Sequence, residues 1–450
     1  MKKIIYFLAL CCVVAFSAGA NTLLADKYGS FSVLGDSFST FKGYNDPVTN
    51  TPFFPRSQTD VTDVEQTWWK LFENETGMRL EQNNSFSGSA MCTYGKNNTT
   101  DLTNSFVGRV SNLREAGLII IEGATNDNTF NAPIGEYAWS NFTDAAKRTY
   151  RGGTAYVIDY LQRKYPKSTI VFMLNYGLSE DINSSTEAIC EHYGIPLLKL
   201  SNMSKKLNHP DVEGMKTIKS ELSHFLYNLE GITYISEDSE VSVKEGKDNA
   251  DVMVDKTMTA GEWSSVCFPF SLSKAQIASV FGEGTKVQTV ETVEGTELKL
   301  APVSSIDANR PYVINPERNL QKPFLVEGVK LEPAVPIEVG KGKVIVSGLY
   351  RPKAGRLTRV YYYTFDRTGN LYNDATPGWM IPALSVSVKT QSTIVPTGSV
   401  QSDGSGIGEI EAEQNGESLG KGIYDLQGRQ LKCIPAPGIY IIDGRKTAIP

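Results

Sequence analysis

Histidine is scarce in this chain, and its cysteines are far apart. Only three histidines occur among 450 residues, and His192, His209 and His224 all lie in the first half. The six cysteines form no Cys-x-x-Cys pair, which excludes the usual sequence signatures of zinc sites and redox pairs. Any chemistry assisted by histidine is therefore expected in the first half, and the sequence indicates no metal and no organic cofactor.

Long apolar runs are missing after the N-terminus. Lysines at positions 2–3 precede the apolar run Ile4–Phe16 and a group of small residues, which is the pattern of a signal peptide over residues 1–20. That run is too short to span a membrane, and no later stretch reaches the roughly 20 apolar residues that a spanning helix needs. The alternatives are a retained anchor and a lipoprotein modified at Cys11 or Cys12. We expect an exported protein without a membrane span.

Positive charge is in the minority. The formal net charge is −6, and it becomes −8 when the two lysines of the signal peptide are lost. An acidic exported protein is unsuited to nucleic acids and anionic lipid surfaces, whereas neutral or acylated glycans and small esters fit it better. Four cysteines remain in the processed chain, either as disulfides or as buried free thiols: Cys92, Cys190, Cys267 and Cys433.

The first half of the chain alternates short apolar runs with helical patterns. The runs are continuously apolar, as expected of strands buried on both faces, at Phe31–Leu34, Leu118–Ile121, Thr169–Asn175 and Ile195–Leu200. Helices are predicted between them at Glu65–Phe72, Ala155–Lys164 and Ser184–His192. This alternation predicts βαβ units around a mostly parallel sheet, in an α/β domain over residues 21–236.

The second half has a different pattern. Helical periods disappear after about residue 240, and strand-like runs separated by turn residues replace them at 265–270, 286–293, 343–346, 359–365 and 383–389. We expect a linker over 237–251 and an all-β sandwich or barrel over 245–396. A second linker, 397–420, is rich in glycine, serine and glutamate. Two matched runs then predict a C-terminal β-hairpin region over 421–450, with strands at 422–426 and 438–442.

The most informative motif is Gly35-Asp36-Ser37, which directly follows the first predicted strand. A serine on a tight turn at the carboxyl end of a strand is exposed in the way that a nucleophile requires. Asp36 is expected to hydrogen-bond the turn rather than to react. If Ser37 is a nucleophile, it needs a base and an oxyanion hole.

The three histidines are the candidates for the base. His192 lies near the end of a predicted helix, and His224 precedes an apolar stretch, so helix capping and packing explain these two. His209 lies in a loop ahead of a helix, with Pro210 near the first turn. A loop histidine of this kind can reach across to a serine, so we predict His209 as the base.

Two further segments can supply donors to an oxyanion. Gly88 lies in a polar loop of small residues, where a bare backbone N–H can approach a substrate closely. Asn126 follows the strand Leu118–Ile121, and loss of such a side-chain donor costs about 100- to 1,000-fold in rate. Each also has a structural explanation, Gly88 as a turn glycine and Asn126 as a helix cap.

In their order and local context, Ser37, Gly88, Asn126 and His209 make residues 28–235 resemble the SGNH (GDSL-type) hydrolase superfamily. The resemblance rests on Gly-Asp-Ser-x-Ser, the glycine loop, Thr-Asn-Asp and His-Pro. It implies an α/β fold, a flavodoxin-like three-layer α/β/α sandwich. It also implies that Ser37 is the nucleophile, that His209 moves its proton, and that the N–H groups of Ser37 and Gly88 and the amide of Asn126 form the oxyanion hole.

Two positions depart from the pattern of that family. Ala124 replaces the usual glycine two residues before the oxyanion asparagine, which is tolerable if its φ is negative. Lys206 stands where the family commonly has an aspartate, three residues before the histidine. His209 must then be oriented by a backbone carbonyl, by Asp211 or Glu213, or by an acid from elsewhere. A serine–histidine dyad would still work.

These features predict an exported serine esterase that hydrolyses carboxylic esters through an acyl-enzyme at Ser37. O-acyl groups on polysaccharides, such as acetyl, are the expected substrates, because an exported hydrolase with a β-module suits a polymer that must be held. One alternative is a lipase or small-ester esterase. The other is a catalytically inactive surface glycan-binding protein, which Lys206 keeps open.

The C-terminal half carries two weaker resemblances. The β region resembles accessory β-sandwich modules of exported proteins from gut-type bacteria. The last 30 residues resemble the sorting domains of type IX secretion, through Tyr-Asp-Leu-Gln-Gly-Arg and Pro-Gly-Ile-Tyr-Ile-Ile-Asp-Gly-Arg-Lys. The alternative is a terminal hairpin that completes the sandwich. The sorting resemblance implies a secretion machinery as partner, and a location in the periplasm, at the surface or outside a Gram-negative bacterium.

Overall fold

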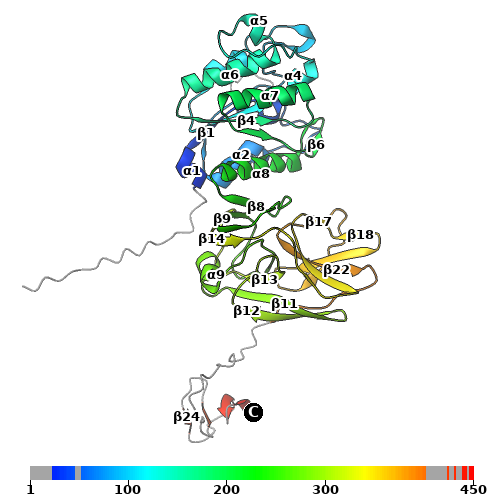
Figure 1. Ribbon diagram of the computed structural model, residues 1–450. Helices are drawn as coiled ribbons and strands as arrows, with labels where there is room; N and C mark the ends of the chain where they lie inside the picture. Colours follow the sequence, from blue (N-terminus) through cyan, green and yellow to red (C-terminus); the bar gives the residue numbers. More distant parts are fainter. Residues whose placement is uncertain are drawn as a thin grey trace, which may run out of the picture. The chain divides into compact units, whose positions relative to one another are not determined.

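The computed structural model describes residues 23–45 and 52–401, together with the backbone of four short strands within 423–449 (Figure 1). The chain divides into two compact units, Met1–Gln401 and Ser402–Pro450. The predicted signal peptide, 1–20, lies outside the described residues. Within the described part, no helix is long and apolar enough to cross a membrane.

A parallel five-stranded sheet forms the centre of the first half, in the order β2-β1-β3-β4-β5. Its strands are β1 (Ser30–Gly35), β2 (Arg79–Ser85), β3 (Leu118–Gly123), β4 (Thr169–Leu174) and β5 (Leu197–Lys199). This is the flavodoxin-like order, in which the strand order reverses between β1 and β3 and leaves a site at their carboxyl ends. The predicted α/β fold class is confirmed.

Helices cover both faces of this sheet, α2 and α8 on one and α6 and α7 on the other (Figure 1). The helices of this half are α1 (Leu23–Tyr28), α2 (Trp68–Thr76), α3 (Phe106–Arg109), α4 (Thr125–Phe130), α5 (Asp144–Lys147), α6 (Tyr150–Lys164), α7 (Glu180–Tyr193) and α8 (Val212–Leu229). Alternate side chains of a strand point to opposite faces. In β3, Leu118 and Ile120 therefore pack toward α2 and α8, whereas Ile119 and Ile121 pack toward α6 and α7.

Strand β2 escaped the sequence prediction because its buried residues are polar. Gln82, Asn83, Asn84 and Ser85 are all buried, yet none is apolar. The Asn83 amide donates to the carbonyl of Ser39 at 2.8 Å, so at least this buried group is satisfied. β2 lies at one edge of the sheet, and its carboxyl end contributes to the site described below.

Antiparallel sheets fill the second half, as predicted. One sheet contains β10 (Ser264–Val266), β13 (Tyr312–Asn315), β11 (Lys286–Glu294) and β12 (Glu297–Val303). Another contains β15 (Glu338–Val339), β16 (Val344–Leu349), β22 (Ser385–Gln391), β19 (Val360–Phe365), β18 (Arg356–Leu357) and β20 (Leu371–Tyr372). A small pair is formed by β17 (Lys353–Ala354) and β21 (Met380–Ile381).

The second half also contains a helix, α9 (Lys274–Phe281), which the predicted all-β region did not include. Its start is fixed by a capping box, in which Ser273 and Gln276 each bond the backbone of the other. The helix buries only Ile277 and Phe281, so its apolar period is too short to stand out in the sequence.

The linker predicted over 237–251 is wrong in its second half. Strand β9 (Lys247–Asp255) begins there, pairing in parallel with β8 (Thr233–Ser236) and antiparallel with β14 (Phe324–Leu331). The first residues of β9 are charged and exposed, and their sequence therefore resembles that of a linker. Because β8 directly follows α8, one three-stranded sheet joins the two halves of the chain.

Buried ion pairs reinforce this junction. Lys219 of α8 lies 2.5 Å from Glu75 of α2 and 3.3 Å from Asp255 at the end of β9. The hydroxyl of Tyr234, on β8, donates to the same aspartate at 2.7 Å. Asp255 is fully buried, so these donors are needed to hold its charge away from water.

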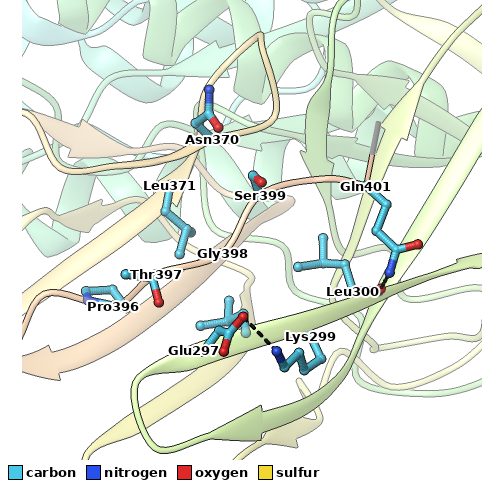
Figure 2. A pocket seen from close by; sticks show the side chains of 11 residues that line it. Glu297, Lys299, Leu300, Asn370, Leu371, Pro396, Thr397, Gly398, Ser399 and Gln401 are labelled. Atoms are coloured by element: carbon cyan, nitrogen blue, oxygen red, sulfur yellow. Dashed lines mark hydrogen bonds and ion pairs between the residues drawn. The ribbon is translucent and has the colours of Figure 1, made fainter. Parts of the chain in front are cut away.

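The second predicted linker, 397–420, begins too early. Residues 397–401 run beside β12, and the Gln401 amide donates to the carbonyl of Leu300 at 2.6 Å (Figure 2). This segment, β12, Asn370 and Leu371 line a groove of about 600 Å³. The rest of the predicted linker lies outside the described residues.

The C-terminal unit contains a small antiparallel sheet. Its order is β24-β23-β25-β26, with β23 (Ile423–Tyr424), β24 (Gln430–Leu431), β25 (Gly438–Ile442) and β26 (Arg445–Ile449). β23 and β25 fall within the two predicted strand runs. Among the described strands, these four pair only with one another.

The cysteines that the structure describes are free thiols. Cys92, Cys190 and Cys267 are all buried and unpaired with another cysteine. Burial raises the pKa of the Cys190 and Cys267 thiols to about 12, so both stay protonated at neutral pH. Cys433 lies outside the described residues.

Candidate active site

Ser37 stands on the first turn after β1, at the carboxyl edge of the parallel sheet. Asp36 caps the short 3₁₀ helix that begins at Ser37, because its Oδ1 accepts the N–H of Phe38 at 2.9 Å. Only glycine fits at Gly35, since a Cβ there would lie 2.5 Å from Ser85 Oγ. The Gly-Asp-Ser motif therefore makes the tight turn that presents the serine.

A two-residue hairpin carries the candidate base. Its strands are β6 (Lys205–Lys206) and β7 (His209–Pro210), and the turn residues Leu207 and Asn208 have φ of 52° and 61°. Positive φ at both central positions is what such a tight turn requires. His209 directly follows the turn, and its Nε2 lies 2.8 Å from Ser37 Oγ.

The second ring nitrogen of His209 bonds the backbone of its own hairpin. Nδ1 lies 2.8 Å from the carbonyl oxygen of Leu207. A carbonyl only accepts, so Nδ1 carries the proton and Nε2 is left as an acceptor facing the hydroxyl of Ser37. This is the tautomer that a general base needs. The backbone carbonyl thus occupies the place of the acid that the sequence leaves unassigned.

The carboxylates near His209 have other partners. Asp211 caps the N-terminus of α8, where it accepts a backbone N–H. Glu213 pairs with a lysine one turn further along the same helix. Lys206, in the family's aspartate position, lies 2.6 Å from Asp60. Within the described ranges, no carboxylate bonds the imidazole.

Aromatic rings enclose the imidazole of His209. Phe53 stacks on it with ring centres 3.3 Å apart and planes 9° from parallel, and the rings of Phe38 and Phe54 lie within 6.2 Å. Burial lowers the pKa of His209 to about 4; the bond to the Leu207 carbonyl opposes this shift, and two nearby cations add to it. The base is therefore neutral at physiological pH and ready to accept a proton.

The two predicted oxyanion donors lie next to the nucleophile turn. β2 and β3 flank β1, so the loop with Gly88 and the start of α4 with Asn126 share the sheet edge that holds Ser37. Gly88 is exposed, with φ of 81°, and the Asn126 amide donates to the carbonyl of Ser89 at 2.9 Å. In the described part of the chain, the N–H groups of Ser37 and Gly88 have no protein acceptor. Both donors are therefore available to a ligand.

Arg109, which the sequence did not single out, ties this edge together. Its side chain is 2% exposed and donates to the Gly35 carbonyl at 3.1 Å, to Ser89 Oγ at 3.0 Å and to Asn84 Oδ1 at 2.9 Å. Burial lowers the pKa of Arg109 to about 9, so it still carries its charge at neutral pH. One side chain thus fixes the ends of β1 and β2 and the loop that contains Gly88.

Glu122 accepts hydrogen bonds from the turn that contains Ser37, and the sequence analysis did not identify it either. It lies at the end of β3, fully buried, and accepts from Ser39 Oγ at 2.8 Å and from the Asn175 amide at 2.7 Å. Burial raises the pKa of Glu122 and of the neighbouring Asp36. The available signal was an acidic residue directly after an apolar strand run, a position that core packing alone does not explain.

Ala124 does not have the negative φ under which an alanine could replace the family's glycine without strain. Ala124 has φ of 78° and stands at the turn between β3 and α4, two residues before Asn126. A side chain in this left-handed region costs about 1 kcal/mol relative to glycine. Its methyl group is completely buried in the core beside α6, which offsets part of that cost.

The other two histidines lie away from this arrangement, as predicted. His192 stacks on Trp139, with ring centres 3.9 Å apart, and is exposed. His224 lies on α8, 6.2 Å from the ring of Tyr234. In the described ranges, no group of three or more His, Cys, Asp or Glu side chains is arranged to hold a metal ion.

The chain has clear relatives among protein families and solved structures. A model of the family described as GDSL-like Lipase/Acylhydrolase matches residues 29–226. A protein assigned as a GDSL-like lipase from Bacteroides ovatus is 42% identical, over 44% of this chain and 98% of that one, with a TM-score of 0.43. A second, from Bacteroides uniformis, is 38% identical over 43% and 92%, with a TM-score of 0.42.

More distant similarity extends to a family two carbohydrate esterase from Clostridium thermocellum, solved in complex with cellohexaose. It is 15% identical over 45% of this chain and 64% of that one, with a TM-score of 0.31. Comparison with the curated proteins gives no match. The family model, together with the identity to the two Bacteroides proteins over nearly their whole length, shows that this chain belongs to the GDSL-like lipase/acylhydrolase family.

Proposed function

We propose that this protein is an exported serine esterase that removes O-acyl groups, such as acetyl, from polysaccharides. The observation that carries the proposal is the 2.8 Å contact between His209 Nε2 and Ser37 Oγ, with Nδ1 bonded to a backbone carbonyl. A neutral imidazole in this tautomer can take the proton of the hydroxyl as the oxygen attacks.

Acylation follows from this geometry. Ser37 Oγ forms a bond to the ester carbonyl carbon while its proton moves to His209 Nε2. Negative charge develops on the carbonyl oxygen, where the N–H groups of Ser37 and Gly88 and the amide of Asn126 would stabilise it. When the tetrahedral intermediate collapses, the bond to the alcohol oxygen breaks. That oxygen takes the proton from His209 and leaves as a free hydroxyl.

Deacylation repeats the sequence with water. Water attacks the acyl-serine and gives a proton to His209, and the carboxylic acid then leaves as Ser37 Oγ regains that proton. The imidazolium that forms in each step is stabilised by the dipole of the Leu207 carbonyl rather than by a full negative charge. A dyad of this kind is expected to be slower than a complete triad, but active.

The polysaccharide substrate and the export are inferred from other parts of the chain. Residues 1–20 have the pattern of a signal peptide. The antiparallel sheets are joined to the α/β domain through β8, β9 and β14, so a polymer bound to them would lie at a fixed distance from Ser37. Both features suit an enzyme that works on a large extracellular substrate.

The proposal is tested with the mature protein on p-nitrophenyl acetate and on acetylated xylan, with acetate release as the readout. Ser37→Ala and His209→Asn should each lower kcat by about a thousandfold or more. His192→Asn, which changes an exposed histidine of the same domain, should leave kcat unchanged. Equal, background-level rates for the wild type and Ser37→Ala would refute the esterase and favour a glycan-binding protein. Activity confined to p-nitrophenyl acetate would favour a small-ester esterase, and preference for long-chain esters a lipase.

We further propose that residues 421–450 direct the protein to the cell surface. Their motifs Tyr-Asp-Leu-Gln-Gly-Arg and Pro-Gly-Ile-Tyr-Ile-Ile-Asp-Gly-Arg-Lys resemble those of sorting domains, and their described strands form a sheet of their own. Deleting 421–450 should leave esterase activity and thermal stability of the purified protein intact while abolishing its delivery to the surface of the native host. Loss of folding on deletion would contradict this role.

A further inference from the structure

Phe53 has a different partner on each face of its ring. The imidazole of His209 covers one face, at 3.3 Å and 9°. The guanidinium of Arg56 lies 4.3 Å from the same ring centre, and because the imidazole occupies one face, Arg56 lies over the other. Arg56 is exposed, so its N–H donors face solvent from the same ring that orients the base.

A second cation also lies near the imidazole of His209. Lys205 precedes the hairpin turn, and its ammonium lies 5.2 Å from the ring centre of Phe38, the residue after the nucleophile. Lys205 is half-buried, and this burial lowers the pKa of its ammonium. The negative charge of Asp36 and Glu122 offsets the shift only in part. A bound anion would compensate the remainder.

Neither cation has a carboxylate partner in residues 23–45 and 52–401. The neighbouring lysines differ in this respect, since Lys206 pairs with Asp60 and Lys216 pairs with Glu213. The two unpaired cations are the ones whose side chains lie over Phe53 and Phe38, the rings that pack on the imidazole. Two cations near the imidazole thus lack an ion-pair partner among the described residues.

We propose, resting on the serine esterase function above, that Arg56 and Lys205 bind a carboxylate on the alcohol part of the substrate. The preferred esters are then O-acylated acidic saccharides. The alcohol part is favoured over the acyl part because His209 must protonate the departing alcohol oxygen, which places the alcohol beside the imidazole. The acyl carbonyl oxygen points instead to Gly88 and Asn126. A guanidinium held over a ring is also positioned to bind a carboxylate with two parallel hydrogen bonds.

Binding of an anion here would also assist the chemistry. Arg56 and Lys205 both disfavour the imidazolium that forms on His209 during catalysis. A carboxylate between them would cancel that repulsion in the substrate complex. The substrate would then supply the negative charge that the missing triad acid provides elsewhere in the family.

The test compares two substrates that differ only in charge: a methyl glucuronoside and a methyl glucoside, each acetylated at the same hydroxyl. We expect the wild type to prefer the glucuronoside in kcat/KM by about tenfold, and the preference to shrink as sodium chloride rises from about 50 mM to about 500 mM. Arg56→Gln and Lys205→Gln should each reduce the preference about five- to tenfold, mainly by slowing the glucuronoside. Lys216→Gln removes an exposed lysine that is paired with Glu213, and it should leave the preference for the glucuronoside unchanged.

The outcomes separate this inference from the function on which it rests. Equal rates on the two substrates would overturn the inference and leave the esterase intact. A preference that survives both Arg56→Gln and Lys205→Gln would also overturn it. Acetate release from neither substrate, at the level of Ser37→Ala, would overturn both. A preference for neutral sugar esters of succinate over those of acetate, lost in the two variants, would place the anion on the acyl part and refute the assignment.

Discussion

Lowering the pH should inactivate the proposed esterase only near pH 4, because His209 must be neutral to accept the proton of Ser37. Burial against three aromatic rings lowers the pKa of His209 from 6.5 to about 4. At pH 5, a base with pKa 4 is about 90% neutral, whereas one with pKa 6.5 would be about 3% neutral. The two cases differ by about thirtyfold in kcat/KM at that pH.

The same structure says how to move this limit. Phe53→Ala removes the stacked ring and admits water to the imidazole, so the pKa of His209 should rise toward 6.5. Phe53→Leu keeps an apolar cover and should move the pKa much less. The assay is kcat/KM for p-nitrophenyl acetate between about pH 3.5 and about pH 8, followed at the isosbestic wavelength of nitrophenol.

The test uses only the pH at which kcat/KM falls on the acid side of its profile (the acid limb). A variant with a lower maximal kcat/KM can therefore still be compared with the wild type. A wild-type limb near pH 6.5 would refute the reasoning, since burial would then not control the base. An unchanged limb in Phe53→Ala would show that the stacked ring is not the cause. Binding of an anionic saccharide should raise the limb in kcat relative to kcat/KM, because it favours the imidazolium.

Three further predictions concern the supports of the site and the junction. Asn126→Ala should lower kcat about 100- to 1,000-fold in steady-state ester hydrolysis with KM little changed, and an unchanged kcat would remove Asn126 from the oxyanion hole. Arg109→Met leaves the Gly35 carbonyl and Asn84 without their donor, so the free energy of unfolding measured in urea should fall by about 2–5 kcal/mol. The kcat should fall as well, because the loop that contains Gly88 is no longer held by the bond to Ser89. Arg109→Lys should restore neither stability nor kcat, because one ammonium cannot reach all three acceptors. Lys219→Met leaves the buried carboxylate of Asp255 without its lysine partner, so the free energy of unfolding in urea should fall by about 3–5 kcal/mol at neutral pH. Lys216→Met removes an exposed ion pair and should change the free energy of unfolding by less than about 0.5 kcal/mol. The pKa of Asp255 is lowered in the folded state, so its ionised form stabilises the fold fully above the ordinary aspartate pKa. This stabilisation is lost as the pH falls through the lowered pKa. The difference in unfolding free energy between the wild type and Lys219→Met should therefore become smaller in acid.

The sequence predicted the sheet wherever strands are buried by apolar residues. β1, β3 and β4 lie between two helical layers and consist of continuous apolar runs, so burial alone reveals them. β2 could not be found in that way, because its buried residues bond the nucleophile turn and Arg109 rather than a core. β9 was hidden by its exposed, charged first half, although its second half is fully buried.

For the candidate site, the motifs identified the residues that we propose to react, but not the residues that support them. Ser37, Gly88, Asn126 and His209 each belong to a short pattern that can be recognised without coordinates. Arg109 and Glu122 act through partners distant in the chain, such as Ser89 and Ser39, and distances of that kind have no local signature. The sequence left four possible partners for the His209 ring: a backbone carbonyl, Asp211, Glu213 or an acid from elsewhere in the chain. Only the fold of the hairpin shows that the partner is the Leu207 carbonyl.

The hairpin of residues 205–210 also determines which substitutions near the candidate base can be tolerated. A triad depends on an acid that is correctly placed against the histidine, and the acid position cannot vary without loss of the base. Here the acceptor is a main-chain carbonyl, which every amino acid at position 207 would supply as long as the turn is kept. Position 206 therefore need not hold a carboxylate for His209 to keep its orientation. It holds a lysine whose ion pair with Asp60 ties the hairpin to the loop that carries Phe53 and Arg56, so the residue in the place of a triad acid instead helps to position the segment that we propose contacts the substrate.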